Sequence, residues 1–418
     1  MSDEEIANYD KVIARLGTAT ELPLRQEFAR ALVDKGRALV QMDKSGEAMV
    51  AFDEVIARFD TATELPLREQ VARALVNKGS LLDDLGRYRE AIAIFDDVIA
   101  RFGTATEPSL YVSATLALYN KGNSLRDMDE NKQAIAVYDE VIARVGDGTG
   151  TELLLRTAVA RALVNKGVLL SRMEMFSEEI AAHDGVIAHF GTATEFPLRK
   201  EVAKALFNKG NRLCQMDKNK EAIAVFDELI AHSGGATELS LREVVASALV
   251  NKAIILGQMN QTEEEIAVYD EVITRFGGAT ELTLRAQEAR ALGCKAMLLD
   301  LTDKRDEAIA IYDDVIARFG GAPEPALREV VHKVLFNKAA ALSQMNKREE
   351  AIAACDEVIA ILEEEDETSP FLEFAREIKK STMDEKLRGP DVTGSTVKTG
   401  STVQRVFYVA EPPRDRNR

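Results

Sequence analysis

The sequence predicts an all-α protein built from stacked helical hairpins, and three observations lead to this fold class. A short motif, Asp-x-(Val/Leu)-Ile, recurs every 43 residues, with a single interval of 45. A second motif, a lysine followed by glycine or alanine, recurs with the same spacings. Between the two motifs, apolar residues follow steps of three and four, the spacing of one face of an α-helix.

The two motifs define one repeat register, because they keep the same offset in every copy. The interval of 45 contains a two-residue insertion around residues 146–150. The aspartates of the first motif are Asp10, Asp53, Asp96, Asp139, Asp184, Asp227, Asp270, Asp313 and Asp356. The lysines of the second motif are Lys35, Lys78, Lys121, Lys166, Lys209, Lys252, Lys295 and Lys338.

The first helix of each unit is illustrated by the apolar positions Leu67, Val71, Leu75 and Leu82. They predict a helix of about twenty residues, roughly 30 Å long. Gly86 ends this helix, since glycine adopts the left-handed backbone that a tight turn requires. Most residues at the equivalent turn position tolerate that backbone as well. They are Asp43, Asp129, Glu174, Asp217, Asn260, Asp303 and Asn346.

The second helix of the same unit is predicted from Tyr88 to Phe102, where the chain reaches a Gly-Thr-Ala-Thr loop. One aromatic position on this helix recurs along the chain, and we expect it to lie in the core. This column is Tyr9, Phe52, Phe95, Tyr138, Phe226, Tyr269 and Tyr312. The next first helix is expected to start with Thr63 as N-cap and Pro66 in the first turn.

The columns from Leu75 to Val98, with Lys78-Gly79, Ala91 and Phe95 at fixed spacings, resemble the tetratricopeptide (TPR) repeat. The family unit has 34 residues, so this chain carries extended 43-residue repeats. The resemblance implies a right-handed superhelical solenoid of antiparallel helix pairs over residues 1–388. It would contain about eight full hairpins, with a half unit at each end. We expect residues 389–418 to form a disordered C-terminal tail.

Composition argues for a soluble chain that does not bind nucleic acid. The 53 basic and 70 acidic residues give a net charge of −17, which repels phosphate backbones. No stretch reaches the eighteen or so apolar residues that span a membrane. The cysteines Cys214, Cys294 and Cys355 are too far apart for a disulfide framework or a zinc site. We predict a cytoplasmic protein without membrane partners.

No catalytic constellation, cofactor motif or metal site is readable, so we predict a protein that is not an enzyme. The four histidines are scattered and lack zinc spacing. Most paired charges have a structural explanation as helical i, i+4 pairs. Glu64 with Arg68 represents one recurring pair, and Glu54 with Arg58 represents another.

The candidate binding residues are polar columns on the first helices, which line the concave face in proteins of the family that this chain resembles. An asparagine amide can both donate to and accept from an extended peptide backbone. A mostly basic row lies four residues earlier on the same face. The asparagines are Asn77, Asn120, Asn165, Asn208, Asn251 and Asn337. The basic residues are Arg73, Arg161, Lys204, Arg290, Lys333, Arg376 and, in the last asparagine position, Lys380.

These columns predict a non-catalytic scaffold that binds an extended, acidic peptide segment of a partner protein. Two alternatives remain open at this point. The asparagines could instead tie one helix to the next. The terminal half units could also stack between molecules and build a dimer or filament.

Overall fold

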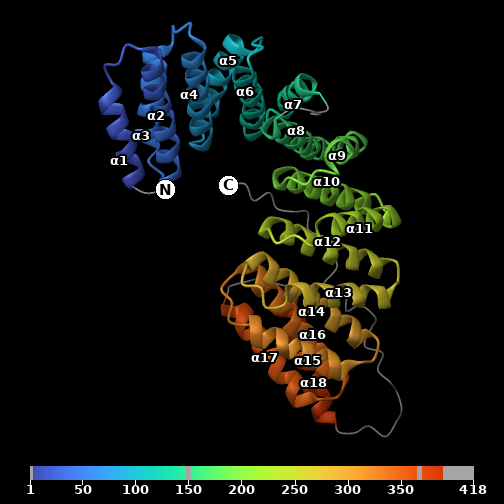
Figure 1. Ribbon diagram of the computed structural model, residues 1–418. Helices are drawn as coiled ribbons and strands as arrows, with labels where there is room; N and C mark the ends of the chain where they lie inside the picture. Colours follow the sequence, from blue (N-terminus) through green and yellow to red (C-terminus); the bar gives the residue numbers. More distant parts are fainter. Residues whose placement is uncertain (1–2, 147–151, 365–369, 389–418) are drawn as a thin grey trace. The chain divides into compact units, whose positions relative to one another are not determined.

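The computed structural model describes residues 3–146, 152–364 and 370–388 (Figure 1). Within these ranges the chain is α-helical and contains no strand. The helices are α1 (Asp3–Leu16), α2 (Leu22–Gln41), α3 (Ser45–Phe59), α4 (Leu65–Asp84), α5 (Tyr88–Phe102), α6 (Pro108–Asp127), α7 (Asn131–Val145), α8 (Leu153–Arg172), α9 (Phe176–Phe190), α10 (Phe196–Gln215), α11 (Asn219–Ser233), α12 (Leu239–Gln258), α13 (Thr262–Phe276), α14 (Leu282–Leu301), α15 (Arg305–Phe319), α16 (Pro325–Gln344), α17 (Arg348–Glu364) and α18 (Pro370–Arg388).

The hairpin prediction is confirmed over the described residues. Even-numbered helices from α2 to α16 are first helices, and each is followed by a second helix, which gives eight hairpins between α1 and α18. The predicted second helix from Tyr88 to Phe102 has the observed bounds of α5. Residues 147–150, in the stretch that contains the two-residue insertion, and the predicted tail, 389–418, lie outside the described residues.

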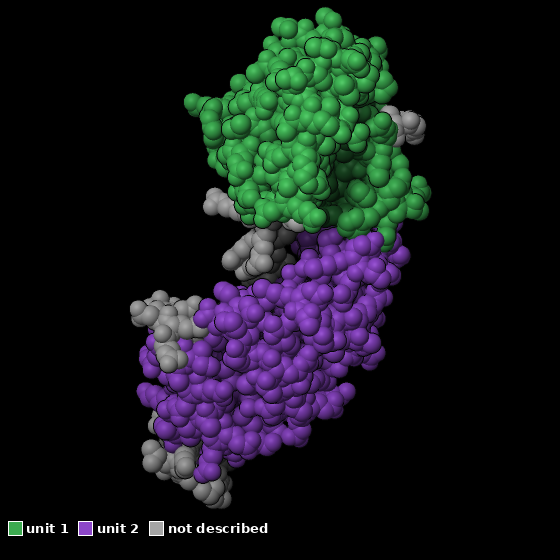
Figure 2. Space-filling view, turned by 60° about the vertical axis from the view of Figure 1, so that its left-hand side comes forward, with its two compact units in different colours: residues 1–205 green, residues 206–418 purple. Residues whose placement is uncertain are grey.

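The helices fall into two compact units, residues 1–205 and residues 206–418, coloured separately in Figure 2. The boundary lies inside α10. In unit 1, the first helices α2, α4, α6 and α8 contact one another in sequence. In unit 2, α12, α14, α16 and α18 do the same. Stacking of like helices is the way in which hairpins with one apolar face bury it.

The tight turns inside the hairpins use the predicted left-handed residues. Gly86 has a φ of +71°. The seven predicted equivalents have φ values from 57° to 61°, and six of them are aspartate or asparagine. Their side chains tolerate this backbone better than most, so a single positive-φ residue ends each first helix.

The aromatic column lies in the core, as predicted. Phe52, Phe95 and Tyr138 are fully buried, as are the equivalent residues of later hairpins, Phe226, Tyr269 and Tyr312. Tyr9, on the terminal helix α1, is half-buried. In the hairpin of Phe95, glycine at the facing position of the first helix makes room for the ring. A β-carbon added at Gly79 would lie 2.5 Å from Cε1 of Phe95.

The predicted threonine N-caps are wrong. Helix α4 begins at Leu65, so its N-cap is Glu64, which has an extended backbone, and Pro66 lies in the first turn. The Glu64 carboxylate turns back and accepts a hydrogen bond from the Thr63 backbone N–H at 3.1 Å. The same contact recurs at Thr106, Thr194 and Thr280. The N-cap residue is therefore the glutamate that follows the threonine, and not the threonine itself.

The predicted pair of Glu64 with Arg68 is also wrong, whereas Glu54 and Arg58 do pair, at 3.9 Å. Glu64 contacts Arg25 of the preceding hairpin at 3.0 Å, and Arg68 reaches Glu107 of the following one at 3.5 Å. A glutamate at the N-cap has left the helical backbone, so i, i+4 geometry does not apply to it. Equivalent inter-hairpin pairs join Arg156 to Glu195, Arg242 to Glu281 and Arg285 to Glu324.

Candidate functional site

Consecutive first helices pack directly on one another. Consecutive second helices are joined by long side chains at their ends, as where Arg101 of α5 donates to Asp60 after α3 at 2.8 Å. The surface along the first helices is called the first-helix face below. All six predicted asparagines lie on these helices, and all are half-buried.

Three of the asparagines tie their helix to the preceding first helix. Nδ2 of Asn120 donates to Oγ of Ser80 at 3.0 Å, and Nδ2 of Asn251 donates to Oδ1 of Asn211 at 2.8 Å. Asn165 makes the corresponding contact. The role that links helices is therefore realised at these positions. It uses the amide nitrogen, and the amide oxygens of these three side chains have no partner among the described residues.

Asn337 differs because its neighbourhood is apolar. Its Nδ2 atom is buried and makes no hydrogen bond within the described residues. In the sister hairpins the acceptor lies three residues after the asparagine position of the preceding first helix. On α14 that position holds Met297, which is 5% exposed and offers only a weak acceptor. The asparagines of the column therefore differ in their hydrogen bonding: Asn120, Asn165 and Asn251 donate to the preceding first helix, and Asn337 does not.

An aromatic cluster accompanies Asn165 and was not found from the sequence. Tyr138 donates its hydroxyl to Oδ1 of Asn123 at 2.8 Å, and Nδ2 of Asn165 donates to the same oxygen at 3.1 Å. The ring of Tyr119 lies 6.2 Å from that of Tyr138. Burial raises the pKa of both tyrosines, so both hydroxyls stay protonated. The spacing of the aromatic column predicted only that the Tyr138 ring is buried. It did not predict the hydrogen bond that the Tyr138 hydroxyl makes.

Unit 1 gathers excess positive charge on the first-helix face at Asp34. Its carboxylate lies 3.3 Å from Nη2 of Arg73, 3.6 Å from Nε of Arg30 and 3.9 Å from Nη1 of Arg37. Three guanidinium groups thus share one carboxylate. Arg37 escaped the sequence prediction, because it lies outside the two columns that were followed, although it is one helical turn after Asp34.

A second cluster in unit 1 surrounds Glu201, which is 2% exposed. Arg161 approaches its Oε1 atom at 3.5 Å, and Lys204 approaches Oε2 at 3.2 Å. The side chains of Arg161 and Lys204 are 48% and 41% exposed. Two half-exposed cations again share a single carboxylate, and this one is buried.

The predicted basic residues of unit 2 are placed differently. Lys333 pairs with Glu329 at 2.5 Å, and Arg376 pairs with Glu363. Arg290 is half-buried, and Lys380 is exposed. The clusters in which several cations share one carboxylate, at Asp34 and Glu201, lie in unit 1.

The described residues contain no group of three or more histidine, cysteine, aspartate or glutamate side chains arranged to hold a metal ion. In those same ranges, no helix combines the length and apolar character that crossing a bilayer requires.

Models of known families match three parts of the chain. Two tetratricopeptide repeat models match residues 33–106 and 116–147. A model of anaphase-promoting complex subunit 5 matches residues 296–378. A search of curated proteins finds no match.

Solved structures with the same helical-repeat fold include RapI in its apo form, with a TM-score of 0.53 and 10% sequence identity. That similarity covers 86% of this chain and 99% of RapI. The quorum sensor NprR from B. thuringiensis, in its apo form, has a TM-score of 0.44 and 14% identity, over 85% of this chain and 92% of NprR. A tetratricopeptide repeat protein from Parabacteroides merdae has a TM-score of 0.40 and 13% identity, over 73% and 98%. With the repeat register, the hairpins and the two family models in agreement, this chain is a tetratricopeptide repeat protein.

Proposed function

We propose that the protein is a non-catalytic scaffold that binds an extended, acidic peptide segment of a partner protein on the first-helix face of unit 1. The observation that carries this proposal is the surplus of positive charge at two points of that face. Three arginines surround Asp34, and Arg161 and Lys204 share Glu201. The whole chain has a net charge of −17, so these clusters are local exceptions.

The charge surplus favours an anionic ligand because a bound carboxylate would complete an arrangement that is short of negative charge. Guanidinium groups bind carboxylates through strong, directional hydrogen bonds. The side chains of Arg161 and Lys204 are 48% and 41% exposed, so a ligand can reach both. Acidic side chains of the partner thus supply affinity and orientation at the two clusters.

Asn120 and Asn165 lie on the first helices between the two clusters, on α6 and α8. Each donates one N–H to the preceding helix, which fixes the orientation of the amide. The amide oxygen then accepts from a backbone N–H of the ligand, whatever the ligand's side chains are. A fixed amide loses little side-chain entropy on binding, so the helix contacts support the binding role.

The experiment compares two capped peptides of equal length, one rich in aspartate and one with asparagine at the same positions. Fluorescence anisotropy with the intact protein should show preferential binding of the acidic peptide, weakening as salt is raised. Arg161→Gln and Arg73→Gln should each weaken binding about tenfold, as expected for loss of one charge-assisted hydrogen bond. Arg58→Gln, on a second helix, is the matched control and should bind like the unaltered protein.

The triple variant Asn120→Ala, Asn165→Ala, Asn208→Ala tests the backbone contacts separately. It should weaken both peptides while circular dichroism shows unchanged helicity. Equal binding of the two peptides, or full binding by Arg161→Gln, would contradict the proposal. Sedimentation velocity over a range of protein concentrations distinguishes the alternative of self-assembly, which predicts a size that grows with concentration.

A further inference from the structure

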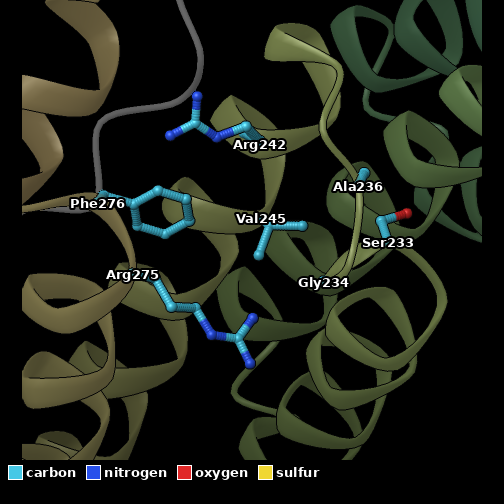
Figure 3. Close-up of a pocket in the computed structure, with 7 residues that line it drawn as sticks. All are labelled: Ser233, Gly234, Ala236, Arg242, Val245, Arg275 and Phe276. Carbon is cyan, nitrogen blue, oxygen red and sulfur yellow. The ribbon is translucent and has the colours of Figure 1, made fainter. Parts of the chain in front are cut away.

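Unit 2 contains a pocket of ≈ 400 Å³ between the loop after α11, the start of α12 and the end of α13 (Figure 3). Its lining residues are Ser233, Gly234, Ala236, Arg242, Val245, Arg275 and Phe276. In Figure 3 the two arginines lie on either side of Phe276 and Val245. The pocket lies on the loop side of the hairpins and belongs to unit 2, whereas the proposed peptide site belongs to unit 1. It is called the Ser233 pocket below.

The repeat register identifies the sister position in unit 1, where Phe59, Asp60, Arg68, Val71 and Arg101 replace Ser233, Gly234, Arg242, Val245 and Arg275. There the Asp60 carboxylate accepts a hydrogen bond from Nη1 of Arg101 at 2.8 Å. Arg101 also contacts Asp97, four residues before it, at 3.3 Å. The guanidinium thus has one carboxylate from its own helix and one from the neighbouring loop.

At a second sister position, within unit 2, the arginine Arg318 also has two carboxylate partners, but the second carboxylate comes from a different helix position. Arg318 contacts Asp314 of its own helix at 3.1 Å, and it also contacts the carboxylate of Glu288. Glu288 is 1% exposed and occupies the register position of Val245. Two sister arginines therefore each receive a second carboxylate, from two different places in the repeat.

Arg275 has only the first of these two partners. Its Nη2 atom lies 2.6 Å from Oε1 of Glu271, four residues before it. The two positions that supply the second carboxylate in the sisters hold Gly234 and Val245. Nη1 of Arg275 lies 3.0 Å from the place of a β-carbon at residue 234, so the guanidinium borders the site that Asp60 fills in unit 1.

Ser233 enlarges this site. Five equivalent residues, Phe59, Phe102, Phe190, Phe276 and Phe319, are phenylalanines that are at most 5% exposed, and two others, Leu16 and Val145, are also apolar. Serine lacks the ring, and its hydroxyl lies 3.2 Å from Nδ1 of the adjacent His232. Arg275 therefore lacks both the second carboxylate that Arg101 and Arg318 have and the apolar side chain that the sister hairpins hold beside it.

We propose that the Ser233 pocket is a docking site for a carboxylate side chain, aspartate or glutamate, of a partner protein. The incoming carboxylate takes the place that Asp60 and Glu288 occupy in the sister hairpins, bound by Nη1 of Arg275. Arg242 supplies a second guanidinium, since its ion pair with Glu281 is long, at 3.6 Å. Phe276 and Val245 pack against the methylene groups of the ligand.

Comparison with the sister hairpins favours a carboxylate ligand over an aromatic ring or a phosphate. Where an aromatic residue lies at the mouth, as with Tyr111 under Arg144 at 4.5 Å, it takes the register position of Arg242. In this hairpin that position is already filled by an arginine. A phosphate would bring two negative charges close to Glu271 and Glu281, whereas a single carboxylate brings one, as Asp60 does beside Arg101.

The test uses the intact protein and saturation-transfer NMR, which detects weak ligands of a large protein. The probes are N-acetyl-glutamate methylamide and its glutamine counterpart, with inorganic phosphate and N-acetyl-phenylalanine methylamide as competitors. The glutamate probe should bind at least tenfold better than the glutamine probe. Arg275→Gln should weaken it about tenfold, and Arg242→Gln should weaken it by a smaller factor. Arg58→Gln, in the same register position as Arg275, should leave binding unchanged.

A second pair of variants fills the pocket from within. Gly234→Asp restores the carboxylate of Asp60, and it should abolish binding of the glutamate probe and raise the melting temperature. Gly234→Asn has the same shape without the charge, so it should do neither to the same extent. The proposal is overturned if the glutamine probe binds equally well, or if Arg275→Gln binds normally. It also fails if phosphate or the phenylalanine probe displaces glutamate at lower concentration, or if no glutamate binding is seen.

Discussion

Lys78 on α4 donates from Nζ to Oδ1 of Asp53 on α3 at 2.6 Å. The two residues belong to the two motifs that define the repeat, so their contact joins one hairpin to the next. The same contact, at 2.5 to 2.6 Å, pairs Lys35 with Asp10, Lys121 with Asp96, Lys166 with Asp139, Lys252 with Asp227, Lys295 with Asp270 and Lys338 with Asp313. The lysine side chain is 22% exposed and the aspartate is 51% exposed at the Lys78 pair.

We expect each of these pairs to contribute modestly to stability, because the aspartate remains in contact with water. Lys78→Met or Asp53→Asn should lower the free energy of unfolding by about 0.5–1 kcal/mol, and the loss should shrink at high salt. Urea denaturation with a double-mutant cycle measures the coupling. The exposed pair of Arg87 and Glu90, at the start of α5, is the control and should show a smaller coupling. Equal coupling for both pairs would contradict a special role between hairpins.

Gly79 permits the close approach of Phe95, so its substitution should be costly. Gly79→Ala would place a β-carbon 2.5 Å from the ring, and we expect a loss of about 1–3 kcal/mol from overpacking. Gly46→Ala is the matched control, because nothing lies within 4 Å of its β-carbon and it is helical. That change should stabilise by up to about 1 kcal/mol. Similar thermal midpoints for the two variants would show that the ring does not set the requirement.

Gly86 is required for its backbone rather than for space. Its φ is +71°, and a β-carbon there would meet nothing within 4 Å. Gly86→Ala should therefore cost about 1 kcal/mol, the price of the left-handed conformation. Asp129→Gly, at the equivalent turn with a φ of 58°, should have the opposite sign. Chemical denaturation of both variants checks the prediction, which fails if the two changes have the same sign.

The cysteines should differ in reactivity because of burial. Burial raises the pKa of the Cys294 and Cys355 thiols to about 11, and the pKa of half-buried Cys214 is raised as well. Below its pKa a thiol stays protonated, so Cys294 and Cys355 hold almost no reactive thiolate at pH 8. Ellman's reagent should modify Cys214 first in the native protein, and the other two only after unfolding. Cys214→Ser should remove the first phase, and a surviving fast phase would contradict this assignment.

The sequence by itself determined the repeat register, the turns and the bounds of the second helix Tyr88–Phe102, but not where the first helices begin. Residues within one helix or one turn control these features, as at Tyr88–Phe102 and at the left-handed Asp129. The buried aromatic column also followed from spacing, because a helix has one face toward its neighbours. Such features need no knowledge of how far one hairpin is displaced from the next.

Only the tertiary structure decided which partners meet across hairpins. In the sequence, Arg68 has Glu64 four residues before it and Glu107 in the next hairpin. It pairs with Glu107, because stacking of the hairpins brings the N-cap of α6 close to Arg68. The gathering of three arginines at Asp34 and the missing carboxylate at Arg275 have the same origin. Each depends on the offset between neighbouring helices, and many side-chain arrangements with the same sequence spacing have nearly equal energies until that offset is fixed.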